Sequence, residues 1–151
     1  MGDTALKVLK TNLENLSSSL VWLQRSYDRC MLIGIKAEYA EDEFDQFENL
    51  ASRYARTVDL LVNKSLRSID VVEFIDGGSI IDAANRAEKR GIVDSVSELR
   101  DLKDLRNEIA HEYETDDLPK FFGLILEAVP RLFVVADHIK EYCRRYDENC
   151  N

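Results

Sequence analysis

The chain has 151 residues with only two prolines, and 45% of its residues are hydrophobic and 32% charged. This length suits one domain whose core needs no disulfide or metal to hold it. The formal charge of −9 excludes a generally basic nucleic-acid-binding surface, so any contact with RNA must be local, at a few arginines. An acidic surface also suits a basic protein partner.

The cysteines and the first residues indicate a cytoplasmic protein. The chain has three cysteines, Cys30, Cys143 and Cys150, with no CxxC pair. An odd number of cysteines without such a pair is typical of reduced thiols and not of a zinc site or a secreted disulfide framework. The first ten residues include Asp3 and Lys7 and lack the apolar core of a signal peptide. The sequence also lacks the run of about 18 apolar residues that a membrane helix requires.

Two long helices are predicted first, because apolar residues recur at alternating steps of three and four. The first stripe is Leu6, Leu9, Leu13, Leu16, Leu20, Leu23, Tyr27 and Cys30. Gly34 is expected near the end of this helix. The second stripe, from a helix that starts at about Asp42, is Phe44, Phe47, Ala51, Tyr54, Val58, Leu61, Ser65, Ile69 and Val72. This second helix would be about 50 Å long and should stop at Asp76-Gly77-Gly78, the clearest break in the chain.

Three further helices follow. Ser79 is a candidate N-cap for a short helix, Ile80–Arg90, and Gly91 is a candidate stop. A third long helix is predicted from about Val93 to about Tyr113. The last begins after Asp117 with Pro119 in its first turn, and Pro130 inside it predicts a kink. Its stripe is Phe122, Ile125, Val129, Leu132, Ala136, Ile139, Cys143 and Tyr146.

No strand pattern, internal repeat or low-complexity tract competes with these helices. The sequence therefore predicts an all-α fold, a single domain over residues 1–151 in which long antiparallel helices form a bundle with one short inserted helix. The long stripes either form an autonomous core or offer more apolar surface than one chain can cover. The second interpretation favours a dimer.

Arg106 interrupts the apolar side of the third long helix. That side is predicted to be Ile92, Val96, Leu99, Leu102 and Ile109, with Ala110 at its edge. Steps of seven from Ile92 pass through Leu99 and Arg106 to Tyr113, so a guanidinium lies in a column that is otherwise apolar or aromatic. Because an unpaired charge is costly to desolvate, Arg106 must pair with a buried acid, line a wet cleft or bind an anion.

Two neighbours of Arg106 extend this candidate site. Asn107 and His111 are four residues apart and share one helix face. They lie about 100–140° around an ideal helix from Arg106, but long side chains near a helix end can converge over one cleft. His138, the other histidine, has no such context and is interpreted as an ordinary helix side chain.

The segment RNEIAHEY, residues 106–113, resembles the signature of HEPN-domain toxins, in particular the HepT family. That signature is Arg, four residues, His, one residue and Tyr, and the Asn after the Arg matches its common form. The likeness covers eight residues by motif and nearly the whole chain by architecture. It implies a helical bundle that dimerises, with the motifs of two subunits facing one cleft, and a metal-independent endoribonuclease activity on tRNA or mRNA.

The resemblance also implies a partner and a modification. HepT proteins are toxins of type VII-like toxin–antitoxin pairs, and their antitoxin MntA is a minimal nucleotidyltransferase that transfers AMP to the motif tyrosine. Tyr113 would be that acceptor in this chain. AMP on Tyr113 would add bulk and a negative phosphate where the substrate phosphate must lie.

The same residues suit RNA cleavage without a cofactor. The 2′-hydroxyl attacks the adjacent phosphorus when a base takes its proton and an acid protonates the leaving 5′-oxygen, and a histidine with an ordinary pKa of about 6.5 suits both tasks. One chain offers one candidate, His111, so a two-fold dimer would supply both. Arg106 would hold the phosphorane, Asn107 would position the phosphate or His111, and Tyr113 would contact the substrate.

Two other functions fit these residues. A helical module that accompanies a nucleotidyltransferase would use Arg106 and His111 to bind a nucleotide phosphate without chemistry. An acidic helical dimer whose motif is a coincidence would be a plain interaction protein. The intact pair of Arg106 and His111 favours the enzyme, because an adaptor has no need of it.

Overall fold

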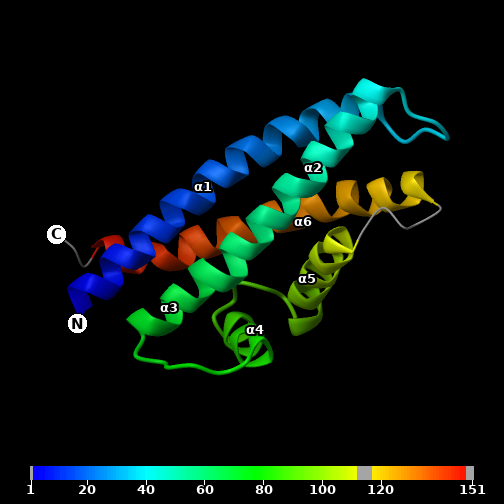
Figure 1. Cartoon of the computed structure of the whole chain (residues 1–151). Helices are drawn as coiled ribbons and strands as arrows, with labels where there is room; N and C mark the ends of the chain where they lie inside the picture. Colours follow the sequence, from blue (N-terminus) through cyan, green and yellow to red (C-terminus); the bar gives the residue numbers. More distant parts are fainter. Residues whose placement is uncertain (1, 112–116, 149–151) are drawn as a thin grey trace.

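A computed structural model describes residues 2–111 and 117–148 (Figure 1). Every regular element in these two ranges is a helix, which confirms the all-α fold class. The elements are α1 (Gly2–Ile33), α2 (Glu41–Asp59), the π-helix η1 (Leu60–Leu66), α3 (Arg67–Val72), α4 (Ile80–Lys89), α5 (Val96–Ala110) and α6 (Leu118–Glu148). Tyr113 and Cys150 lie outside the described residues.

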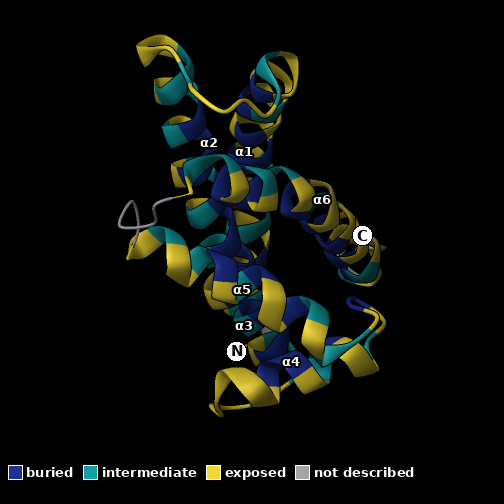
Figure 2. Ribbon diagram, turned by 90° about the vertical axis from the view of Figure 1, so that its right-hand side faces the viewer, coloured by how far each residue is buried: buried dark blue, intermediate teal, exposed yellow. Residues whose placement is uncertain are grey.

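Two long rods form one side of the molecule. Helix α1 is the first rod, and it runs antiparallel to the second rod, which is made of α2, η1 and α3. Helix α6 passes behind both rods, and α4 and α5 lie beside the second rod (Figure 1). Each helix turns its buried residues toward the others (Figure 2), and one hydrophobic cluster includes residues from all of them. The motif helix α5 packs against α2, α4 and α6, so its position depends on three neighbours.

The first predicted helix is confirmed and begins earlier than its stripe, at Gly2. All eight residues of that stripe are buried or half-buried. The helix ends at Ile33, where Gly34 adopts a φ of 75° and its N–H donates to the Cys30 carbonyl oxygen at 2.9 Å. A residue with a side chain would be strained in this left-handed conformation, and glycine ends the helix there without that cost.

The second predicted helix is confirmed as one rod over residues 41–72, with the unpredicted π-helix η1 inside it. Its apolar stripe takes two successive steps of four, from Leu61 through Ser65 to Ile69, and all three residues are fully buried. A wider turn keeps such a spacing on one face of the rod. The rod ends at Val72, and Gly77 and Gly78 then adopt positive φ angles of 71° and 96°.

The later helices agree with the sequence except at the two ends of α5, which ends at Ala110 and not at about Tyr113 as predicted. Ser79 caps α4 and forms a capping box with Asp82, as expected of an N-cap serine. Helix α5 begins at Val96, capped by Ser95, so its predicted start at Val93 was three residues early. Ile92 and Val93 are buried in the preceding turn, which shows that apolar residues there serve the core without being helical. Helix α6 continues through Pro130, and the predicted kink at that residue stays a prediction.

Candidate functional site

Arg106 on α5 forms a two-point ion pair with Asp59, the last residue of α2. Its Nε donates to Oδ1 at 2.7 Å and its Nη2 donates to Oδ2 at 2.8 Å. These hydrogen bonds raise the pKa of Arg106 above its ordinary value and fix the plane of the guanidinium. The side chains are 28% and 39% exposed. Of the three alternatives that the sequence left open for Arg106, the structure shows a carboxylate partner, at the surface and not in the core.

The ion pair lies in an open hollow of about 500 Å³, here called the Arg106 groove. The residues that line it come from α2, η1 and α5: Ser52, Ala55, Arg56, Asp59, Leu60, Asn63, Lys64, Arg106, Ile109 and Ala110. Three of them are basic and one is acidic. Nη1 of Arg106 donates to no described residue. The groove therefore offers a positioned guanidinium edge and two further cations to an anion such as a phosphate.

His111 stands outside this groove. It is the exposed C-cap residue of α5, and its backbone N–H donates to the Glu108 carbonyl oxygen at 3.1 Å. It directly follows Ala110, which lines the groove, but it is not itself a lining residue. Within one chain the structure thus puts the imidazole at the end of the helix and does not join it to Arg106.

Asn107 faces another side of α5. It is exposed and borders a separate hollow of about 140 Å³ between α4 and α5, with Ile80, Ala84 and Lys103 among its lining residues. Arg106 and Asn107 therefore do not share one cleft within a chain, as the angle of about 100° between successive helix positions requires. Tyr113, the proposed AMP acceptor, lies outside the described residues.

A buried charge cluster escaped the sequence reasoning. This Asp70 network consists of Asp70 and Glu73 near the end of the second rod and Arg86 and Arg90 on or next to α4. Asp70 accepts from Arg86 Nε at 3.0 Å, Arg86 Nη2 at 2.8 Å and Arg90 Nη1 at 2.8 Å. Arg90 also donates to Glu73. No local pattern identifies it, because the partners are up to 20 residues apart in the chain.

Hydrogen bonding keeps both carboxylates of the Asp70 network ionised. Burial alone would raise the pKa of Asp70, but the hydrogen bonds from Arg86 and Arg90 outweigh it, and the pKa is lowered from the ordinary 3.8. Glu73 behaves in the same way, because hydrogen bonds from Tyr142, Tyr146 and Arg90 lower its pKa from 4.5 despite burial. The bonds from Arg86 and Arg90 to Asp70 hold α4 to the rod, and the hydroxyls of two α6 tyrosines, Tyr142 and Tyr146, hold α6 to it through Glu73.

The other histidine and the two cysteines that the structure describes form no site of this kind. His138 has its Nδ1 2.9 Å from the Ile92 carbonyl oxygen, which agrees with its interpretation as an ordinary side chain. Cys30 and Cys143 are free and buried, and burial raises their pKa values to about 11 and about 12. Within residues 2–111 and 117–148, no cluster of three His, Cys, Asp or Glu suits a metal ion, and no helix there is long and apolar enough to cross a membrane.

Sequence reasoning also missed the cations around the Arg106 groove. Arg53, Arg56, Lys64 and Arg67 recur along the second rod at helical spacing, the same signal that revealed the apolar stripes. Comparisons of the chain with protein-family models, with curated proteins and with solved structures found no match. The motif and the geometry of its surroundings are therefore the basis for a function.

Proposed function

We propose that this chain is a HEPN-like toxin of the HepT kind, an endoribonuclease that cleaves tRNA or mRNA without a metal. The site would be composite, with Arg106 and His111 contributed by each subunit of a homodimer. The observation that carries the proposal is Arg106 itself. In a chain of charge −9, the arginine of the motif is fixed by Asp59 in an open groove, with two further cations beside it. Its third guanidinium nitrogen donates to none of the described residues.

A second subunit supplies what one chain lacks. His111 is exposed at the end of α5 and outside the groove of its own chain. In a two-fold arrangement of motif helices, each His111 would approach the Arg106 groove of the other subunit. The site would then hold two imidazoles, one for each proton transfer. Asn107 shares a helix face with His111, so we assign it the support of that histidine and not of the phosphate.

The reaction follows from these groups. One His111 takes the proton of the 2′-hydroxyl, whose oxygen attacks the adjacent phosphorus. The second His111 protonates the 5′-oxygen as its bond to phosphorus breaks, leaving a 2′,3′-cyclic phosphate and a 5′-hydroxyl. Arg106 donates to the phosphorane oxygens as they gain charge, and Asp59 holds the guanidinium in place for this.

A cleavage assay on tRNA and mRNA with EDTA present tests the proposal. His111→Ala and Arg106→Ala should each lower the rate by about 100-fold or more, since general acid–base groups and preorganised donors contribute that much. His138→Gln is the matched control, because it removes the other imidazole of the chain and should retain the wild-type rate. Wild-type cleavage by purified His111→Ala would remove the proposal.

Neutralisation by AMP forms part of the same proposal. The partner would be an MntA-type nucleotidyltransferase, which would join the Tyr113 oxygen to the α-phosphorus of ATP and release pyrophosphate. With partner and ATP present, mass spectrometry should find AMP on Tyr113, and Tyr113→Phe should retain ribonuclease activity. AMP on another residue, or on none, would contradict this assignment.

A second candidate is a non-catalytic module that binds a nucleotide phosphate in the Arg106 groove and accompanies a nucleotidyltransferase. The position of His111 outside the groove favours it, since a phosphate there needs only Arg106, Arg56 and Lys64. The cleavage assay separates the two, because this module would bind nucleotide but turn over no RNA.

A further inference from the structure

We propose that the face formed by α1 and the second rod is a binding track for single-stranded RNA that leads to the Arg106 groove. It is here called the basic face and is defined by Trp22, Arg53, Arg56, Lys64, Arg67 and Phe74. The choice of RNA among polyanions rests on the proposed ribonuclease function. The track itself rests on independent observations of charge, shape and exposed aromatic rings.

Three hollows adjoin one another at shared lining residues of the second rod and together form the path. The Arg106 groove shares Arg56 and Leu60 with a hollow of about 550 Å³ between α1 and α2. It shares Asn63 and Lys64 with a third, of about 390 Å³, between α1, η1 and α3. The cations of the rod extend from Arg53 to Arg67, which at the rise of a helix is about 20 Å. A few consecutive phosphates can therefore contact the face at once.

The charge of this path is opposite to that of the chain. Its lining residues include five cations, from Arg53 to Arg106, and one acid, Asp59, which is already paired with Arg106. The chain as a whole carries −9. The side chains of Arg56 and Lys64 are exposed and form no ion pair with any described residue. Five cations gathered around one acid in an acidic protein indicate an anionic ligand.

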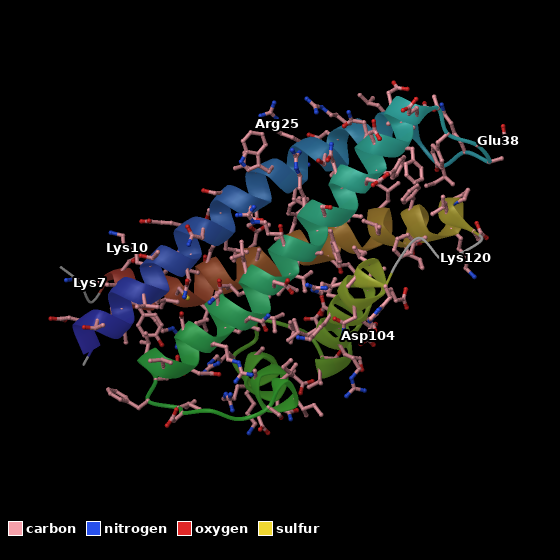
Figure 3. All side chains as sticks on the ribbon, in the orientation of Figure 1. Lys7, Lys10, Arg25, Glu38, Asp104 and Lys120 are labelled. Atoms are coloured by element: carbon pink, nitrogen blue, oxygen red, sulfur yellow. The ribbon has the colours of Figure 1, made fainter. Side chains whose placement is uncertain are left out.

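An exposed tryptophan lies at one end of the path. Trp22 is 50% exposed, and the guanidinium carbons of Arg25 and Arg53 lie 4.8 and 5.3 Å from the centre of its ring. Arg53 is fixed by hydrogen bonds to Ser26 Oγ at 2.6 Å and to the Trp22 carbonyl oxygen at 3.2 Å, and Arg25 lies on the outer side of α1 (Figure 3). The exposed indole and its two guanidinium groups together offer planar groups against which a base can stack.

A second exposed ring lies at the other end. Phe74 follows α3 and is 82% exposed, with a positive φ of 62° that is strained for a bulky residue. It borders the third hollow together with Val8 and Val71, which are both half exposed to solvent. Cations between two exposed rings match a single-stranded nucleic acid, in which phosphates alternate with bases. Two copies packed along the whole length of this face would instead oppose the cations from Arg53 to Arg67 of one copy to those of the other.

The fluorescence of Trp22, the single tryptophan of the chain, provides the test. The probe is a 2′-O-methyl RNA strand of about 12 nucleotides, which the full chain cannot cleave because the 2′-oxygen is blocked. We expect it to quench the fluorescence on binding. If about four phosphates contact the face, the logarithm of the binding constant should fall linearly with the logarithm of the salt concentration, with a slope of about −3.

Matched double variants locate the site. Arg56→Glu with Lys64→Glu should lower the affinity by about tenfold or more and make the salt slope shallower by about 1.4. Lys89→Glu with Lys140→Glu makes the same change in net charge at exposed positions on α4 and α6, and should change the affinity by less than about twofold. Unfolding curves of both variants check that they are folded.

Failure of this inference is distinguishable from failure of the proposed function. If the two double variants bind the strand equally, or if Trp22 is not quenched, the track is overturned, even where cleavage depends on His111. A protein interface would give a different result. The strand would then not bind, and the double variant Arg56→Glu, Lys64→Glu would instead change the mass of the assembly or its binding to an acidic protein. That result would overturn the inference. Quenching by the strand with the expected variants supports the track even where no cleavage occurs.

Discussion

The molecule contains two clusters in which arginines pair with carboxylates, and their surroundings differ. In the Asp70 network the side chains of Asp70 and Arg90 are only 4% and 8% exposed, and three arginine nitrogens donate to one carboxylate. In the Arg106 groove the paired side chains are 28% and 39% exposed, and Nη1 of the arginine has no described partner. The same two residue types thus form a closed cluster in one place and an open one in the other.

The difference separates a structural role from a binding role. A buried charge must have its partners within the protein, since the loss of one leaves the others desolvated and unpaired. An open ion pair contributes little to stability, so its geometry is free to serve a ligand. We therefore expect changes in the Asp70 network to alter the free energy of unfolding, and changes at Asp59 and Arg106 to alter binding.

Asp70→Asn should have the largest effect on stability. It leaves Arg86 and Arg90 without their shared counter-charge, and we expect the free energy of unfolding to fall by roughly 3 kcal/mol. Asp59→Asn is the matched control, and it should cost less than about 1 kcal/mol because its pair is exposed. Urea unfolding measures both, and equal losses for the two variants would show that the comparison is wrong.

The second largest effect on stability should come from acid, which weakens the Asp70 network. The pKa values of Asp70 and Glu73 are lowered in the fold from their ordinary 3.8 and 4.5. A carboxylate whose pKa is lowered by folding contributes its full stabilisation at pH values above its ordinary pKa. That contribution is lost as the pH falls through its pKa in the folded protein. Wild type should therefore lose more unfolding free energy between about pH 6 and about pH 3 than a variant with Asp70→Asn and Glu73→Gln. If the unfolding free energies of the two proteins change equally with pH, the Asp70 network is not the source of the acid sensitivity.

Asp59→Asn should have the smallest effect on stability and a measurable effect on binding. It removes the one acid among the described residues that line the Arg106 groove and leaves Arg106 free to pair with a phosphate. We expect the affinity for the 2′-O-methyl RNA strand to rise by roughly three- to tenfold, as one fewer negative charge competes. Anisotropy of a labelled strand measures this. A lower affinity would mean that positioning of the guanidinium by Asp59 outweighs the competition.

The sequence predicted those features that depend on residues close to one another in the chain. The stripe from Leu6 to Cys30, the stop at Gly34 and the cap at Ser79 are all local signals, and the structure confirms each of them. Arg106 was also identified locally, because it interrupts an apolar column. The start of α5 was predicted too early because Ile92 and Val93 are buried without being helical, and the π-helix η1 was not foreseen.

The sequence by itself determined which segments are helices, where most of them end and which arginine is out of place, because periodicity and capping act over a few residues. Only the tertiary structure decided that Arg106 meets Asp59, 47 residues away, that Asn107 faces another hollow and that His111 stands outside the groove. The physical reason is that such meetings depend on how the apolar sides of α2, α5 and α6 pack together. That packing fixes the rotation of each helix and so selects which polar side chains share a surface.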